Sequence, residues 1–217
     1  MGDSAGGNLA LTTTLALRDR EHLSAVFPPF AASSASCCHV PDRFAASSAS
    51  CCHVPDRLES PVLLRPHLPL PAGVVALSPW ADLECLGQSW RTNAAFDYLL
   101  HDPDLTASQW YAPPAPQGPG LRHPLVSPKH AHFRDFPPLL LQVGESETLL
   151  SDALDVQSSA ERHGVSVVLE VYADMPHVFQ FFPYAHHSKA AVAAIGKFVG
   201  ATHACAAAAA AAKNKVA

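Results

Sequence analysis

Three short apolar runs punctuate the chain between longer stretches of mixed polarity. Two of them, Val74–Leu77 and residues 139–143, are rich in Val and Leu and follow Gly or Pro. Runs of this kind are typical of strands that are buried on both faces of a parallel sheet. The third run, residues 165–172, follows a glycine and contains several valines, so it predicts another strand.

Segments with helical periodicity lie between and after these runs. Residues 6–20 are apolar on nearly every side, which is typical of a helix that is itself buried. Residues from about 148 to 163 predict a second helix, with Leu150, Leu154 and Ala160 on one face. Both segments have the length and polarity of helices that cover a sheet.

Further helices are predicted in the later part of the chain. Residues 96–100 and 108–111 look helical, and residues 186–199 carry apolar side chains spaced by four. The Ala-rich tail at 201–217 predicts a frayed extension of that last helix. Strands that alternate with helices imply a mostly parallel sheet with helices on both faces, so the predicted fold class is α/β with residues 1–200 as one domain.

Residues 22–67 interrupt this pattern. Within them the 14-residue sequence FAASSASCCHVPDR occurs twice in succession, at 30–43 and 44–57. Identical copies indicate a recent tandem duplication, and the high Ser, Ala and Pro content predicts a disordered insertion in the domain. The repeated Cys-Cys-His triplets offer soft metal ligands, but adjacent cysteines lack the spacing of structural zinc sites, so we expect no metal.

Composition narrows the classes of function. Of the 217 residues, 48% are apolar and 15% are charged, which is typical of a globular domain of ordinary size. The formal net charge is −5 and no basic stripe is present, so nucleic acid is not an expected partner. No apolar run reaches the ~18–20 residues of a membrane span, and no signal peptide is evident. The six cysteines suggest no disulfide framework, which favours a reducing compartment such as the cytoplasm.

A candidate nucleophile lies at the start of the chain. Residues 2–6, Gly-Asp-Ser-Ala-Gly, fit the G-x-S-x-G pattern that holds a serine on a sharp strand-to-helix turn. Such a turn presents Ser4 at a helix N-terminus, where the Ala5 N–H can stabilise developing negative charge. A serine nucleophile needs a base, and an acid that orients the base. Glu147 and His177 follow in the order serine, acid, histidine, each in a loop after a predicted strand.

Five motifs occur in an order that points to one family. They are GDSAGGNLA at 2–10, LSPW at 77–80, HPLVSP at 123–128, PPLLLQVG at 137–144 and MPHVF at 175–179. Together they resemble the hormone-sensitive-lipase group of α/β-hydrolases, the fold-3 esterases that include arylacetamide deacetylase. The resemblance implies a partial α/β-hydrolase fold and a serine carboxylesterase that acts on small-molecule esters without a cofactor or metal. It implies Ser4 as nucleophile and His177 as general base.

The resemblance also places the acid in the loop after the second predicted strand. Glu147 begins the sequence ETLLSD, which fits the group's E-x-L-L-x-D form, so Glu147 is the predicted acid. Two alternatives stay open: Glu145 in the same loop, and Asp152, which resembles the carboxylate that orients this loop. We interpret Asp82 and Asp97 as structural.

One part of the group's pattern is missing. The group carries a His-Gly-Gly-Gly segment before the elbow, whose backbone N–H groups form most of the oxyanion hole, and no such segment occurs here. The Ala5 N–H remains as the one donor that the pattern names. We therefore expect a chain that lacks the N-terminal half of these enzymes and hydrolyses esters weakly. The alternative is a catalytically impaired fragment or degenerate copy with no activity of its own.

Overall fold

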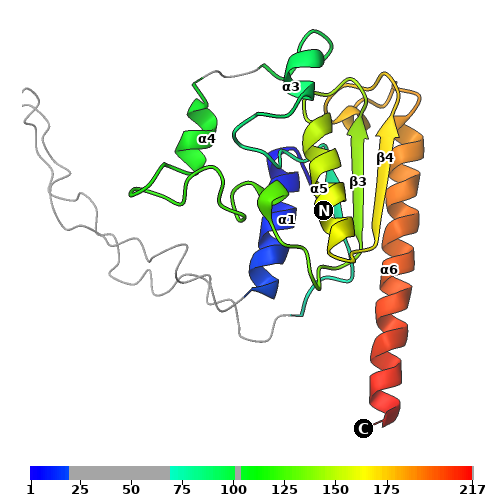
Figure 1. Cartoon of the computed structure of the whole chain (residues 1–217). Helices are drawn as coiled ribbons and strands as arrows, with labels where there is room; N and C mark the ends of the chain where they lie inside the picture. The colour runs from blue at the N-terminus through cyan, green and yellow to red at the C-terminus, as the bar shows by residue number, and fades with distance from the viewer. Residues whose placement is uncertain (20–68, 101–103, 217) are drawn as a thin grey trace, which may run out of the picture.

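Four parallel strands form the centre of the protein in the computed structural model, which describes residues 1–19, 69–100 and 104–216 (Figure 1). The strands are β1 (Gly2–Asp3), β2 (Val74–Leu77), β3 (Leu139–Gly144) and β4 (Val167–Tyr172), and their order in the sheet is the order in the sequence. Every neighbouring pair is parallel. The α/β fold class that the sequence predicts is confirmed.

Two helices cover one face of the sheet. They are α1 (Ala5–Arg18), which follows β1 directly, and α5 (Leu150–Arg162), which lies between β3 and β4 in the chain. Leu11 and Leu15 of α1 are fully buried against alternate side chains of β2 and β3. Burial of one such leucine contributes about 1.5–3 kcal/mol, so α1 is held mainly by its apolar side.

The opposite face is covered by the last helix, α6 (Ser188–Val216). Ile195 and Phe198 of α6 pack against Val75, Leu77 and Leu140, whose side chains alternate with those that face α1 and α5. Period-two alternation along each strand therefore gives two apolar faces, each with its own helical cover. In Figure 1, α6 continues well past the ends of the strands.

Shorter elements lie in the connections and build the edge where the strands end. They are α3 (Ser89–Thr92), α4 (Thr106–Tyr111), and the short 3₁₀ turns η1 (Pro128–His130) and η2 (Phe179–Phe181). The helix predicted at 108–111 falls within α4, but the helix predicted at 96–100 is wrong, because that segment forms turns and bends. The side chains of Asp97 and Tyr98 bond to distant loops there, and such tertiary bonds override local helical preference.

Two details of the predicted helices are corrected. In α5 the buried face contains Ala153, Val156 and Ala160, whereas Leu154 is 43% exposed, so the helix is rotated from the predicted face. In α6 the helix starts at Ser188 and continues through the Ala-rich tail to Val216. A helix packed on a sheet is already nucleated, so good helix formers extend it at little cost.

Some predictions concern residues outside the described ranges. The disordered insertion at 22–67, with its Cys-Cys-His repeats, is among them. Within the described residues one helical stretch, Ser188–Ala212, is long and apolar enough to cross a membrane by length and composition. The sequence prediction had no such stretch. Ile195 and Phe198 from this stretch contact the sheet.

Candidate active site

Ser4 occupies the turn between β1 and α1. Its backbone lies at φ 50° and ψ −120°, a region that a residue with a side chain rarely adopts. The Ser4 N–H donates to Leu77 O at 2.9 Å, and the Ser4 carbonyl accepts from the N–H groups of Asn8 at 3.1 Å and Trp80 at 3.2 Å. A side chain at Gly2 would collide with the carbonyl of Gly6, so the turn closes this tightly only with glycine at that position.

The strained turn leaves the Ser4 hydroxyl free for chemistry. Ser4 is the N-cap residue of α1, yet its side chain makes no capping hydrogen bond. It is half-buried, and Ala5 begins the helix immediately after it. The first N–H groups of a helix have no partner within the helix and carry partial positive charge. This partial positive charge would stabilise an oxyanion formed on a substrate beside Ser4.

Glu147 and His177 form a buried pair at the end of the sheet where β3 and β4 finish. The distance between Glu147 Oε2 and His177 Nδ1 is 3.1 Å, and the two residues are 0% and 3% exposed. Their loops meet because Gly144, the last residue of β3, lies against the backbone of Met175, where any side chain on residue 144 would collide. When the carboxylate accepts the Nδ1 proton, Nε2 is the nitrogen left to take up another proton.

Ser78 supports this pair, and sequence reasoning did not single it out. Its hydroxyl donates to Glu147 Oε1 at 2.7 Å and accepts the Val178 N–H at 3.2 Å. The Gly144 N–H also donates to Glu147 Oε1, at 2.6 Å. Ser78 has φ 44° and is fully buried, and both features could have been suspected only from its place in the LSPW motif.

Burial sets the electrostatics of the acid. Desolvation raises the pKa of Glu147 above its ordinary value, while the hydrogen bonds from His177, Ser78 and Gly144 act in the opposite direction. The donors therefore compensate in part for placing a carboxylate where it is shielded from solvent. A carboxylate held in this way can orient an imidazole and stabilise its protonated form.

The two parts of the site meet at residues 77–78. The Leu77 carbonyl accepts from the Ser4 N–H, and the next residue, Ser78, bonds to Glu147 and to the His177 loop. Among the described residues no hydrogen bond joins the Ser4 hydroxyl to the His177 ring. Such bonds are often long in unliganded enzymes and shorten when substrate binds.

The two alternative acids lie apart from His177. Glu145 is exposed, in the same loop as Glu147. Asp152 is fully buried, and its Oδ2 accepts the N–H groups of Ala81 at 2.8 Å and Asp82 at 2.7 Å. Burial raises the pKa of Asp152 well above its ordinary value. The geometry thus brings Glu147 alone of the three to the histidine.

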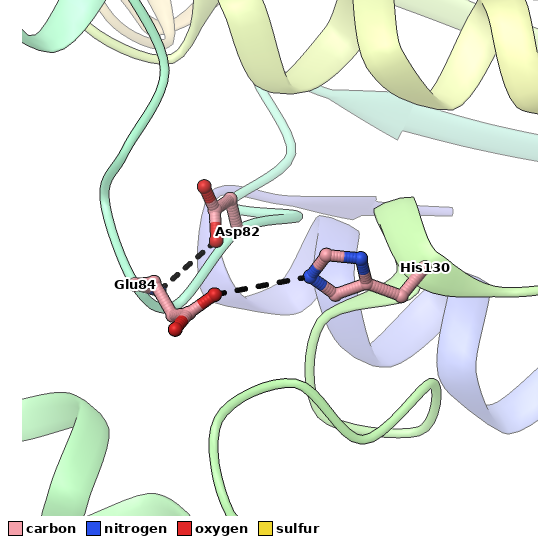
Figure 2. A group of neighbouring side chains, drawn as sticks. All are labelled: Asp82, Glu84 and His130. Atoms are coloured by element: carbon pink, nitrogen blue, oxygen red, sulfur yellow. Dashed lines mark hydrogen bonds and ion pairs between the residues drawn. The ribbon is translucent and has the colours of Figure 1, made fainter.

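Asp82, Glu84 and His130 form the one group of possible metal ligands found within the described residues (Figure 2). Asp82 and Glu84 follow β2, and His130 ends η1, so the three side chains meet outside the sheet (Figure 2). Lys129 Nζ lies 2.6 Å from Asp82 Oδ2, and Arg122 Nε lies 2.9 Å from Glu84 Oε2. These cations already neutralise both carboxylates, so the group is better explained as an ion-pair network that ties η1 to the loop after β2.

A cavity of about 240 Å³ opens beside the nucleophile candidate. Its walls are almost entirely apolar and include Trp80, Trp90, Leu99 and Leu149 as well as Ser4. Apolar walls with one reactive polar group are typical of sites that bind the hydrocarbon part of a small molecule. The cavity lies between the elbow and the segment that follows α3.

Comparison with known proteins gives a consistent result. Residues 1–181 match the family described as alpha/beta hydrolase fold. An acetyl-hydrolase of Streptomyces hygroscopicus is 39% identical over 134 residues, which are 60% of this chain and 43% of that protein. An esterase of Acinetobacter venetianus is 34% identical over 130 residues, which are 59% of this chain and 42% of that protein.

Solved structures agree with the sequence relatives. An esterase from the bacterial hormone-sensitive lipase family is 43% identical, with a TM-score of 0.55 over 60% of this chain and 43% of that one. EstE5, whose crystal was soaked with p-nitrophenyl butyrate, is 28% identical, with a TM-score of 0.64 over 94% of this chain and 52% of that one. The chain therefore spans about half the length of the relatives that it matches.

Proposed function

Because this chain belongs to the α/β-hydrolase fold family, we propose that it carries the catalytic centre of a carboxylic-ester hydrolase. Ser4 is the nucleophile, His177 the general base, and Glu147 the acid that orients the base. The observation that carries the proposal is the buried Glu147–His177 pair, with a distance of 3.1 Å, at the same end of the sheet as a strained serine turn. A buried acid–histidine pair, a strained serine turn and an apolar cavity are together the features expected of a candidate catalytic site.

The chemistry follows from this arrangement. His177 Nε2 takes the proton of Ser4 Oγ as that oxygen attacks the ester carbonyl carbon. The carbonyl electrons move to its oxygen, which the Ala5 N–H stabilises. When the tetrahedral species collapses, the alcohol leaves with the proton from His177, and an acyl group stays on Ser4. Water, activated by the same histidine, then attacks the acyl-enzyme and releases the carboxylic acid.

The substrate is a small-molecule ester with a short to medium acyl group. A cavity of about 240 Å³ with apolar walls suits the hydrocarbon chain of such a group better than it suits a charged or sugar-like one. Trp80 and Trp90 are among the residues that line it. We expect p-nitrophenyl acetate and butyrate to serve as test substrates.

A fluorophosphonate probe tests the nucleophile directly, because it reacts with activated serines. We expect slow, heat-sensitive labelling of Ser4 in the full chain, no labelling in Ser4→Ala, and normal labelling in Ser158→Ala, whose serine is exposed on α5. Ester hydrolysis measured on the same three proteins should follow the labelling. Labelling or hydrolysis that persists unchanged in Ser4→Ala would show that another residue is responsible.

One observation favours a second candidate, a chain with no activity of its own. β1 contains two residues, Gly2–Asp3, and pairs with β2 alone among the described strands. A strained turn persists only where the surrounding structure determines it fully. If the full chain is folded by circular dichroism but neither labels nor hydrolyses, while a longer protein containing it does both, this second candidate is correct.

A further inference from the structure

The segment after α3 contacts both loops that carry the candidate acid and base. Asn93 Nδ2 donates to the carbonyl of Glu145 at 2.9 Å and to the carbonyl of Glu147 at 2.8 Å. The two carbonyls lie either side of the turn that projects the Glu147 carboxylate. One side-chain amide therefore fixes the backbone on which Glu147 stands.

Asp97 joins the same loop to the histidine loop. Its Oδ2 accepts from Thr148 N at 2.8 Å and from Thr148 Oγ1 at 3.0 Å, and its Oδ1 accepts from the His177 N–H at 3.3 Å. Asp97 is 8% exposed, so these bonds are made in a place with little competing water. A single carboxylate thus bridges the residue next to Glu147 and the backbone of His177.

Tyr98 holds the other side of the His177 peptide. Its hydroxyl donates to the His177 carbonyl at 2.7 Å, and its ring meets the imidazole edge-on with the centroids 5.8 Å apart. Phe182 packs edge-on against the same tyrosine. Tyr98 is 55% exposed, and partial desolvation together with the nearby charges of Asp97 and Glu147 raises the pKa of its hydroxyl.

We propose that Asn93, Asp97 and Tyr98 are positioning residues that hold His177 and Glu147 in reacting geometry through their backbones. The inference rests on the proposed function for its chemical meaning, but the contacts exist independently of it. Both the N–H and the carbonyl of His177 are held by two consecutive residues, which fixes the direction of its side chain. We call residues 93–98 the positioning segment.

The positioning segment leads into the walls of the cavity. Leu99 and Leu100 follow Tyr98 directly and line the cavity beside Ser4. An acyl group in the cavity would therefore contact the two residues that directly follow the positioning segment. Loss of the Tyr98 hydroxyl should accordingly lower kcat more than it raises KM, because the contacts with the acyl group remain.

The decisive experiment measures the hydrogen bond between His177 and Glu147 by NMR and does not depend on enzymatic activity. In the full chain labelled with ¹⁵N-histidine, a proton held between His177 Nδ1 and the carboxylate should give a low-field NMR signal that is missing in His177→Asn. We expect Tyr98→Phe to weaken this hydrogen bond, so that the proton exchanges with water about tenfold faster, the effect of losing one ordinary hydrogen bond. Tyr184→Phe is the matched control, because Tyr184 is 97% exposed.

Asp97→Asn is a second test of the same NMR signal. An amide has one oxygen, so it cannot accept hydrogen bonds both from Thr148 and from the His177 N–H as the carboxylate does. The signal should shift or disappear in this variant while circular dichroism stays unchanged. If Asp97→Asn does not fold, Tyr98→Phe decides alone, because its ring can keep its packing on His177 and Phe182. An unchanged signal and exchange rate in folded Tyr98→Phe overturns the proposal.

Fluorophosphonate labelling separates this proposal from the proposed function. Wild-type chain that does not label refutes activity of the chain as it stands, yet the NMR comparison still decides whether the segment positions the pair. Where wild type labels, Tyr98→Phe should label about tenfold more slowly and Tyr184→Phe at the wild-type rate. Equal rates in all three proteins contradict the proposed positioning role.

Discussion

The two parts of the candidate site are held in different ways. Glu147 and His177 are buried. Ser78 and Gly144 donate to the Glu147 carboxylate, Asn93 and Tyr98 donate to the Glu147 and His177 carbonyls, and the His177 N–H donates to Asp97. Ser4, by contrast, is half-buried on a turn whose strand, β1, has two residues and one neighbouring strand among those described. The candidate acid and base therefore have support from several loops, whereas the candidate nucleophile depends on one strand pair, on α1 and on the N–H of Trp80.

This difference means that the proposed catalytic residues can all be present while one of them, Ser4, is held less firmly than the other two. A backbone at φ 50° stores strain that the surroundings must maintain. Related esterases have about twice the length that this chain covers, and additional strands or loops beside β1 could hold the turn and add oxyanion donors. We therefore expect the acid–base half to be correctly formed in this chain and the nucleophile half to limit the rate.

The strongest test joins the N-terminal half of a related esterase to this chain. We expect ester hydrolysis to rise by about 10²–10³, which is the usual effect of supplying a missing oxyanion donor. The rise should appear in the rate of p-nitrophenyl butyrate hydrolysis. It should vanish when the same fusion carries Ser4→Ala. A chain that is already as fast alone would contradict the contrast between the two halves.

Ser78→Ala tests how much the hydrogen bonds of Ser78 stabilise the loops that carry Glu147 and His177. The change removes one donor to Glu147 and leaves the buried Val178 N–H without its partner. Leaving such a group unpaired costs about 1–3 kcal/mol, so the free energy of unfolding in urea should fall by that amount. Ser158→Ala, at an exposed position of α5, should change it by less than about 0.5 kcal/mol. Equal effects would mean that Ser78 is not a structural link between the halves.

The sequence predicted the sheet more reliably than the elements around it. Val74–Leu77 is a strand with the predicted bounds, because a short run of apolar side chains between turn residues has few other stable states. The face of α5 was misjudged at Leu154, since only packing against β3 and η1 decides which side of a helix is buried. The segment at 96–100 looked helical, but its polar side chains bond to loops about 50 and 80 residues away.

The site was partly predictable for a related reason. The order of Ser4, Glu147 and His177 and the motifs around them gave those three candidates, and their catalytic roles stay predictions. Ser78 and Asp97 could not have been given these contacts from the sequence, because nothing local shows that their side chains reach a loop after another strand. The spacing of motifs can therefore suggest which residues react, whereas the residues that position them can be identified only from the folded structure.

Asp152→Asn tests how the second buried carboxylate near the candidate acid makes stability depend on pH. Because burial raises the pKa of Asp152, the folded protein binds its proton more tightly than the unfolded chain does. Its contribution to stability is therefore complete below the ordinary carboxyl range, near pH 3.8, and is lost as pH rises through the raised pKa. The slope is at most about 1.4 kcal/mol per pH unit.

Thermal unfolding measured across this pH range should show the slope in wild type and a flatter profile in Asp152→Asn. Asp155→Asn is the matched control, because Asp155 is exposed on the same helix. It should leave the profile unchanged. A slope of the same size in Asp152→Asn would show that folding does not raise the pKa of Asp152.

Gly6→Ala has the smallest expected effect, and it tests the part of the site that carries Ser4. A methyl group added at Gly6 meets no atom within 4 Å, although Gly6 lies in the first turn of α1 beside the nucleophile turn. Alanine in a helix is more stable than glycine by up to about 1 kcal/mol, so the midpoint of thermal unfolding should rise slightly. Gly196→Ala in α6, where the space is equally open, gives the reference gain. A loss at Gly6 beside a gain at Gly196 would mean that the nucleophile turn is enclosed more tightly than the contacts of β1 and α1 indicate, and the contrast between the two halves of the site would weaken.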